Sequence, residues 1–289
     1  MEDAVRRLGA LGIEADIILF HPYDRWGFAD MGPTADDRYL SYVVRRLWAF
    51  PNVWWSMANE YDFVASKTES DWERLAQVVV GNDPCGHLCS IHNGVVPYDH
   101  SKEWITHVSV QGAAERIEEW RRTWKKPVVL DECGYEGNIE YGWGNITGQE
   151  LTRRFWEGAV RGGYVGHGET YHRDDERLWW AKGGELTGDS PERIAFLRRV
   201  VEEGSGVLEP TGLGIDGLAA KGADGSDLLY FGIARPLFST LSLSEGRYRV
   251  DVIDTWNMTI DSREEVCREG TLRVALPGRE YIALRVTAH

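Results

Sequence analysis

Short hydrophobic runs alternate with helical patterns from residue 1 to about residue 204. The runs are rich in β-branched and aromatic residues and are bounded by turn residues, as buried strands are. They cover residues 15–20 (ADIILF), 53–57 (VWWSM), 88–91 (LCSI), 107–110 (HVSV), 127–130 (PVVL) and 163–167 (GYVGH). Apolar residues recur at helical spacing over 37–48, 70–80, 113–124 and 148–160. Near-continuous apolar strands separated by helices predict a parallel sheet covered by helices.

These patterns amount to six β/α units, and residues 1–11 predict a helix that feeds the first strand. A doubly wound sheet would fit six units, but the sequence has no G-x-G-x-x-G or phosphate loop to support a nucleotide-binding version. A (β/α)8 TIM barrel has eight units. We therefore expect an α/β fold in which residues 1–204 form strands three to eight of a TIM barrel that lacks its first two β/α units. Such a barrel has two unpaired edges, so we expect low stability for the isolated chain unless another segment closes the barrel.

The pattern changes after Gly204. Glycine and proline separate short alternating runs at 227–232, 247–253, 271–275 and 281–286, and no long helical pattern follows. Residues 205–289 are therefore predicted to form a small antiparallel β-sandwich domain.

Polar and ionisable residues follow every predicted strand of the first region. In strand order they are His21, Tyr23 and Asp24; Asn59 and Glu60; His92 and Asn93; Gln111; Asp131 and Glu132; His167 and Glu169. The carboxyl ends of parallel barrel strands meet at one face, where the chemistry of such barrels takes place. The sequence therefore predicts an active site at this face.

Glu60 and Glu132 are the pair best suited to catalysis. Retaining cleavage of a glycosidic bond needs two carboxyl groups ~5–5.5 Å apart, one ionised to attack and one with a raised pKa to donate a proton. Alternatives stay open for both. Glu60 could instead stabilise a helix start through the helix dipole. Asp131 competes with Glu132, because successive side chains of a strand point to opposite faces.

Two segments carry a family resemblance. VWWSMANEYD (53–62) resembles the fourth strand of the clan GH-A retaining glycoside hydrolases, and KPVVLDECGYEG (126–137) resembles their seventh strand. The segments HPYDRWGF, SIHNG, THVSVQG, GGYVGHGETYH and YRVDVIDTWNMT extend the likeness, to family 5-like members with a C-terminal β domain, over nearly the whole chain. The resemblance implies Glu60 as acid/base, Glu132 as nucleophile and Asn59 as a ligand of the sugar 2-hydroxyl. It also implies a chain truncated at its N-terminus.

This sequence departs from the clan pattern at two places. Where many members carry a tryptophan after strand eight, it has His167-Gly-Glu169-Thr-Tyr171, and where many carry a tyrosine near strand six, Gln111 is the nearest polar residue. The remaining candidates for substrate binding are His21, Asp24, Trp26, His92, Asn93, Gln111, His167, Glu169 and Tyr171.

Structural roles are the alternatives for several of these candidates. His21 and Asp24 could order their own loop, His92 could support another residue by a hydrogen bond, and His167 with Glu169 could form a structural pair. Predicted loops also contain the aromatic residues Trp26, Trp143, Trp179 and Trp180, which could stack on sugars or anchor their loops.

Charge and composition limit the kinds of partner that the protein can bind. The net charge of −14 and the lack of a basic patch argue against nucleic acid. The four cysteines form no zinc pattern and are expected to be reduced thiols. No apolar run reaches ~18 residues, so no membrane partner is expected. No signal peptide is visible at Met1, which predicts a cytoplasmic protein, with secretion open if residues precede Met1.

We thus predict a retaining glycosidase that cleaves β-glycosidic bonds of glycosides or saccharides by a two-glutamate double displacement, without a metal or organic cofactor. A non-catalytic sugar-binding protein on the same scaffold is one alternative. A metal-dependent barrel hydrolase is another, although the sequence lacks a His-x-His ligand pattern near a strand end. Sugar specificity, exo or endo action and oligomeric state are left open by the sequence.

Overall fold

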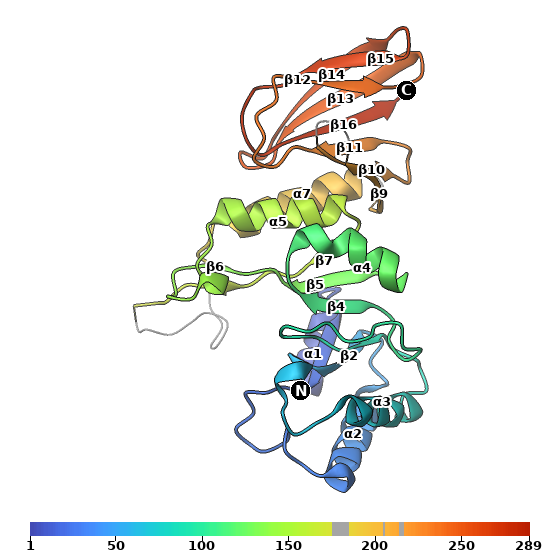
Figure 1. Cartoon of the computed structure of the whole chain (residues 1–289), viewed down its shortest axis with the longest axis vertical. Helices are drawn as coiled ribbons and strands as arrows, with labels where there is room; N and C mark the ends of the chain where they lie inside the picture. Colours follow the sequence, from blue (N-terminus) through green and yellow to red (C-terminus); the bar gives the residue numbers. More distant parts are fainter. Residues whose placement is uncertain (175–184, 205, 214–216) are drawn as a thin grey trace. The chain divides into compact units, whose positions relative to one another are not determined.

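The structure, a computed structural model, describes residues 1–174, 185–204, 206–213 and 217–289 (Figure 1). Its residues cluster into two compact units. The first consists of Met1–Gln111 and Trp120–Val129, and the second of Gly112–Glu119 and Leu130–His289. The helix α4 (Ile117–Trp124) and the strand β5 (Val128–Glu132) each contribute residues to both units.

The first unit is built around a small parallel sheet in the order β1-β2-β3. Its elements are α1 (Glu2–Ala10), β1 (Ala15–Phe20), α2 (Pro33–Leu47), β2 (Val53–Ala58), the 3-10 helix η1 (Tyr61–Phe63), α3 (Glu69–Asn82), β3 (Cys89–Ser90) and β4 (Val108–Gln111). Ala15 lies opposite Val53 and Phe20 opposite Ala58, so β1 and β2 run in register to their carboxyl ends. The parallel pairing predicted for these runs is confirmed.

Strand β2 is the centre of the apolar core in this unit. Val53, Trp55 and Met57 are at most 1% exposed, and they share one cluster with side chains of α2 and α3. The remaining face of β2 is also largely covered, as is typical of a parallel strand with helices on both sides. The indole Nε1 of Trp55 donates to Asp83 Oδ2 at 3.0 Å, which satisfies its one polar atom inside the core.

The second unit begins with short elements and two longer helices. They are η2 (Ala114–Arg116), β6 (Glu136–Gly137), η3 (Gly142–Gly144), α5 (Gly148–Val160), β7 (Tyr164–Val165), β8 (Glu169–Thr170) and α7 (Ser190–Gly204). Helix α5 begins where the sequence predicts, with Thr147 Oγ1 accepting from the Glu150 amide at 3.2 Å. The Glu150 carboxylate binds Arg153 and Arg154.

The C-terminal part of this unit is antiparallel. A six-stranded sheet in the order β14-β13-β16-β11-β10-β9 accompanies a two-stranded sheet, β12-β15. The strands are β9 (Leu208–Leu213), β10 (Leu218–Gly222), β11 (Asp227–Tyr230), β12 (Phe238–Ser242), β13 (Gly246–Asp254), β14 (Thr259–Cys267), β15 (Thr271–Ala275) and β16 (Ile282–Ala288). Buried residues of both sheets, among them Val250, Val274 and Leu284, form one apolar cluster.

The sequence predicted the strands and helices with long apolar patterns and missed several that are short or polar. The antiparallel character of the C-terminal region is confirmed, but the sequence missed β9, β10, β12, β14 and helix α7. The barrel, its missing units and the boundary at residue 204 stay predictions, because the described parallel strands form small sets. All four cysteines are free thiols, and three of them are buried.

Candidate active site

Glu60 directly follows β2, and its backbone is held from both sides. The amide of Asn59 donates to Phe20 O at 3.0 Å, and the amide of Tyr61 donates to His92 O at 2.9 Å. Between these two bonds Glu60 adopts a left-handed conformation with φ of 46°. That conformation is uncommon for a residue with a side chain, and such strain concentrates at functional sites. The apolar strand thus ends in a fixed, strained glutamate that is 8% exposed.

Three side chains donate hydrogen bonds to the Glu60 carboxylate. Tyr23 Oη lies 2.6 Å from Oε2, and Asn59 Nδ2 lies 3.2 Å from the same oxygen. Gln111 Nε2 lies 3.4 Å from Oε1. The predicted candidates Asn59 and Gln111 are therefore brought to Glu60. Tyr23 was noted in sequence only as a polar residue after the first strand, and the structure identifies it as a direct partner of Glu60.

Gln111 is positioned by the loop that follows β3. Its Nε2 also donates to Gly94 O, and Asn93 Nδ2 lies 3.5 Å from Gln111 O. A Cβ on Gly94 would lie 2.5 Å from the Phe63 ring, so any larger residue here would displace that ring. Asn93 itself is 1% exposed.

Asp62 also fixes this loop. Its carboxylate accepts from the amides of Gly94, Val95 and Val96, the last two at 2.8 and 2.9 Å. Burial acts to raise the pKa of Asp62, but these backbone donors outweigh it and lower the pKa below its ordinary value. Asp62 closes the segment VWWSMANEYD, and its role in holding the loop was not visible from sequence spacing.

The loop after β1 contains three of the predicted candidates. The Asp24 carboxylate accepts from the amides of Trp26 at 2.7 Å and Ala29 at 2.9 Å. The bond from Trp26 is the main reason that the pKa of Asp24 is lowered. The ring of His21 lies 6.4 Å from that of Tyr23. Trp26 is 83% exposed and presents a free aromatic surface.

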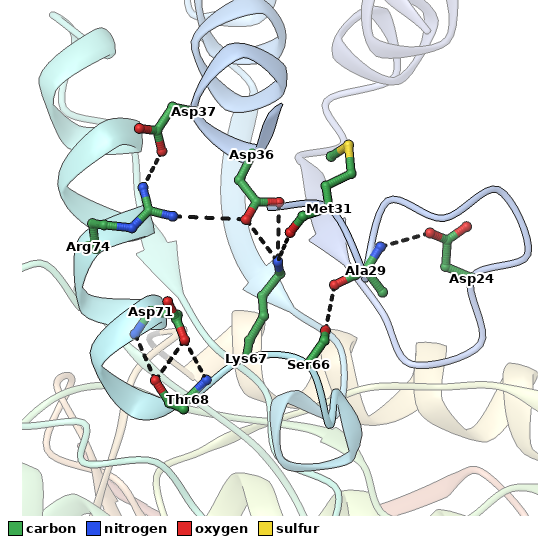
Figure 2. Close-up of polar contacts among 10 residues, drawn as sticks. All are labelled: Asp24, Ala29, Met31, Asp36, Asp37, Ser66, Lys67, Thr68, Asp71 and Arg74. Carbon is green, nitrogen blue, oxygen red and sulfur yellow. Dashed lines mark hydrogen bonds and ion pairs between the residues drawn. The ribbon is translucent and has the colours of Figure 1, made fainter. Parts of the chain in front are cut away.

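A polar network joins this loop to the loop that follows Glu60 (Figure 2). Lys67 Nζ lies 3.0 Å from Asp36 Oδ2, with both side chains at most 4% exposed, and it also reaches Met31 O at 3.5 Å. Ser66 Oγ donates to Ala29 O at 2.7 Å. Arg74 adds ion pairs to Asp37 and, at 3.9 Å, to Asp36. The network fixes the segment that contains Tyr23 relative to the segment that follows Glu60.

His92 is a buried residue at the end of β3. It is 3% exposed, its amide donates to Ala58 O at 3.0 Å, and its Nδ1 lies 3.5 Å from Ser109 Oγ. These contacts favour a role for His92 in supporting another residue by a hydrogen bond over a role in binding substrate.

In the second unit, Glu132 ends β5, and its partner is a tyrosine. The carbonyl of Glu132 accepts from the Gly112 amide at 3.0 Å. The Tyr135 hydroxyl hydrogen-bonds the Glu132 side chain. Burial, followed by the charge and the hydrogen bond of Glu132, raises the pKa of Tyr135. Sequence analysis missed Tyr135, although it lies three residues after Glu132 in the segment that carries the family resemblance.

An aromatic group continues from Tyr135. Its ring meets that of Trp143 edge-on at 6.0 Å, and Trp143 stacks on Tyr141 with the planes 5° apart. Tyr141 and Trp143 are 56% and 49% exposed. Of the other loop tryptophans considered in sequence, Trp179 and Trp180 lie outside the described residues.

Glu136 and Glu169 lie side by side in the parallel pair β6–β8, and both are buried. Glu169 accepts from the amides of Thr187 at 2.9 Å and Gly188 at 3.0 Å. Glu136 accepts from the amides of Asp189 at 2.8 Å and Ser190 at 2.9 Å, where α7 begins. Burial acts to raise the pKa of Glu136, but the bonds from Ser190 and Asp189 lower it overall.

The candidates Tyr171 and His167 join this buried cluster. Tyr171 Oη donates to Glu136 Oε1 at 3.1 Å, and burial beside that carboxylate raises the pKa of Tyr171 to about 12. His167 Nε2 lies 3.5 Å from Ser190 Oγ, and burial lowers its pKa. The partners of Glu169 are donors of Thr187 and Gly188, so its contacts favour a structural role, made through these two residues rather than through a His167–Glu169 pair.

Among the residues that the structure describes, no group of three or more His, Cys, Asp or Glu side chains is arranged to hold a metal ion. No helix among the same residues has the length and apolarity needed to cross a bilayer.

Comparisons with known proteins place the chain in a family. Residues 1–190 match the model of the Apiosidase-like catalytic domain, and residues 216–287 match a domain of unknown function, DUF5605. A crystal structure of a proposed glycoside hydrolase from Bacteroides vulgatus is 37% identical, with a TM-score of 0.93 over 100% of this chain and 62% of that chain. The search of the curated proteins found no match.

More distant structures share the fold alone. A glycoside hydrolase family 5 protein from Bacteroides vulgatus is 14% identical, with a TM-score of 0.76 over 98% of this chain and 72% of that chain. A GH30 endoxylanase from Clostridium papyrosolvens is 11% identical, with a TM-score of 0.54 over 92% of this chain and 72% of that chain.

The resemblance to glycoside hydrolases that the sequence motifs indicated is confirmed by these matches. The family model covers well over half of the chain, and the 37% identical structure aligns along all of it. The chain therefore belongs to the Apiosidase-like family, whose catalytic domain its residues 1–190 match.

Proposed function

We propose that this protein is a retaining glycosidase that uses Glu132 as nucleophile and Glu60 as acid/base. The family match and the resemblance of the two glutamate segments to clan GH-A strands support this assignment. The observation that carries it is the setting of Glu60. A buried carboxylate on a left-handed backbone, held by three neutral side-chain donors, is arranged for chemistry rather than for folding alone.

The reaction would proceed in two displacements. In the first, a Glu132 oxygen bonds to the anomeric carbon while the glycosidic C–O bond breaks, and Glu60 transfers its proton to the leaving oxygen. In the second, Glu60 removes a proton from water, the water oxygen bonds to the anomeric carbon, and the Glu132–sugar bond breaks. Both glutamates return to their starting states. The mechanism requires the two carboxyl groups to lie ~5–5.5 Å apart.

Neighbouring residues would hold the two glutamates through the cycle. A tyrosine hydroxyl can donate to an ionised carboxylate and accept from a protonated one, so Tyr23 can keep its contact with Glu60 in both states. Tyr135 would orient Glu132 in the same way. The side-chain oxygen of Asn59, Oδ1, makes no hydrogen bond within the described residues, which leaves it able to accept from the sugar 2-hydroxyl.

Substrate would be a saccharide or glycoside. The exposed rings of Trp26, Trp143 and Tyr141 are suited to stacking on sugars. His21 and Gln111 are proposed to contact substrate, whereas other sequence candidates are proposed to hold the site residues in position without touching substrate: Asp24, His92, Asn93, His167, Glu169 and Tyr171. The family name makes apiosyl glycosides the first substrates to test, and the clan resemblance favours β-linkages.

We also propose that residues 1–204 form the catalytic barrel domain and residues 205–289 a β-sandwich domain. The family matches to 1–190 and 216–287 support a division in this region.

The proposal is tested with aryl β-glycosides of apiose, xylose, arabinose, glucose, galactose and mannose. Hydrolysis should be lost in Glu60→Ala and Glu132→Ala. Added azide should rescue Glu60→Ala with a β-glycosyl azide product and Glu132→Ala with an α-glycosyl azide product, as determined by NMR. The opposite configurations would exchange the two roles. A chain that folds, binds these sugars and hydrolyses none would instead support the non-catalytic sugar-binding alternative.

A further inference from the structure

A groove opens on the antiparallel C-terminal sheets, within the second unit. It encloses about 290 Å³ and lies along the edge strand β14, between that strand and the end of β15. Its floor consists of Val252, Leu276 and Ile282, which belong to or pack against the apolar cluster shared by the two sheets. Val252 is half-buried, whereas Leu276 and Ile282 are buried, so Val252 has the most exposed apolar surface of the floor. Its volume is close to the lower end, roughly 300 Å³, of known ligand pockets.

The polar wall is fixed in place before any ligand binds. Arg279 Nη2 lies 2.6 Å from Asp254 Oδ2, and Asp254 also accepts from the Asn257 amide at 2.8 Å. Arg263 Nη2 donates to Ala275 O at 3.1 Å, and its Nε lies 3.1 Å from Glu265. Each guanidinium has five N–H donors, so both arginines keep donors free after these contacts. Fixed donors reduce the entropy that ordering them would otherwise cost on binding.

Two polar side chains in the groove, those of Asp261 and Thr259, have no polar partner among the other described residues. The Asp261 carboxylate makes no hydrogen bond or ion pair within the described residues, and it lies opposite Val252 of the floor in the β13–β14 register. The Thr259 hydroxyl, two residues away along β14, is equally uncommitted. The groove thus offers a free carboxylate and a hydroxyl beside free guanidinium donors, over an apolar floor.

The charges of the groove select against anions. Arg279 is neutralised by Asp254 and Arg263 by Glu265, so the charge of Asp261 is left in excess. These groups match a neutral sugar ring. The carboxylate can accept two hydroxyl protons, the guanidinium groups can donate to hydroxyl oxygens, and the apolar floor can pack against C–H groups. We propose that this groove is a second carbohydrate-binding site, separate from the candidate active site, that holds one residue of a neutral saccharide.

The test uses the full chain with Glu132→Gln, so that hydrolysis does not consume the probe. Binding of xylohexaose, cellohexaose, arabinohexaose and mannohexaose is measured by calorimetry, with hexagalacturonate as the acidic probe. At least one neutral probe should bind, and Asp261→Asn should weaken that binding by about tenfold or more, since it removes a charged acceptor. Ala275→Phe, which fills the groove without removing a polar partner, should weaken it as well.

Glu245→Gln is the matched control, because Glu245 is an exposed, uncommitted acid outside the groove. With Glu132 intact, Asp261→Asn should leave hydrolysis of small aryl glycosides unchanged, which separates the groove from the proposed catalytic site. The proposal is overturned if no neutral probe binds, if neither groove variant alters binding, or if hexagalacturonate alone binds.

Discussion

Two buried glutamates, Glu60 in the first unit and Glu169 in the second, differ in what holds them. Glu60 is bound by the side chains of Tyr23, Asn59 and Gln111 and lies on a left-handed backbone. Glu169 is bound by the backbone amides of Thr187 and Gly188 and lies in a regular strand. Both were candidates from their positions after apolar runs.

The difference lies in what each arrangement stabilises. Amide donors belong to a segment that must order itself before it can bind the carboxylate, so Glu169 and its neighbour Glu136 fix the chain just before α7. The donors to Glu60 are instead side chains from three separate segments, and its own backbone is strained. We therefore expect substitutions of Glu60 to affect activity and substitutions of Glu169 to affect stability.

Glu60→Gln tests the first half of this expectation and has the largest predicted effect. The substitution keeps the shape of the side chain but removes its proton chemistry, so kcat/KM should fall by about 10³-fold, within the range known for general acid–base residues. The thermal midpoint should stay within a few degrees. Glu14→Gln, at an exposed and uncommitted acid of the same unit, is the control. A large loss of stability with near-normal kcat/KM would make Glu60 an anchor like Glu169.

Glu169→Gln tests the second half. A glutamine amide placed against the amides of Thr187 and Gly188 leaves buried donors unsatisfied, so the free energy of unfolding should decrease by about 2 kcal/mol. Urea unfolding measures this, with Glu245→Gln as the exposed control. A variant of unchanged stability that loses activity would return Glu169 to the substrate-binding candidates.

The pH dependence of stability tests whether Glu136, the neighbour of Glu169, also has a structural role. Its pKa is lowered in the folded state from the ordinary value of 4.5, so its contribution is present above that value and is lost as the pH falls through the folded pKa. The free energy of unfolding, measured with urea, should therefore decrease less between about pH 7 and pH 4 in Glu136→Gln than in the parent, with a difference of roughly 1 kcal/mol.

His167 titrates in the same pH range, and its pKa depends on Glu136. Burial lowers the pKa of His167 and the charge of Glu136 raises it, so the parent and Glu136→Gln are compared in a His167→Gln background, where this coupling is absent. Equal pH slopes for parent and Glu136→Gln would contradict the anchoring role.

Tyr23→Phe has the smallest predicted effect. It removes the 2.6 Å bond to Glu60 while keeping the ring, so kcat should decrease by roughly tenfold with little change in KM or in the thermal midpoint. A shift in the pH–rate profile would mark Tyr23 as a positioning residue for Glu60. Tyr42→Phe, at a tyrosine 66% exposed, is the control. A Tyr23→Phe variant with a normal pH–rate profile would separate Tyr23 from the chemistry.

The elements that the sequence predicted well are those with an uninterrupted pattern. Residues 15–20 coincide with β1, residues 148–160 with α5, and residues 271–275 with β15. Strand β14 was missed because its exposed face is highly charged, with the sequence TIDSREEVC, and its pairing with β13 comes from backbone hydrogen bonds. Edge strands do not need an apolar run on both faces.

The sequence by itself determined the apolar strands, the order of the two glutamate segments and the family resemblance that they carry. These are local features, set by side-chain period and by neighbouring residues. The tertiary structure alone decided that Tyr23 and Gln111 meet Glu60, that Tyr135 meets Glu132, and that Glu169 holds the chain before α7. Most of these partners are separated by many residues, and hydrogen bonding depends on distance and direction in space, which spacing along the chain does not encode.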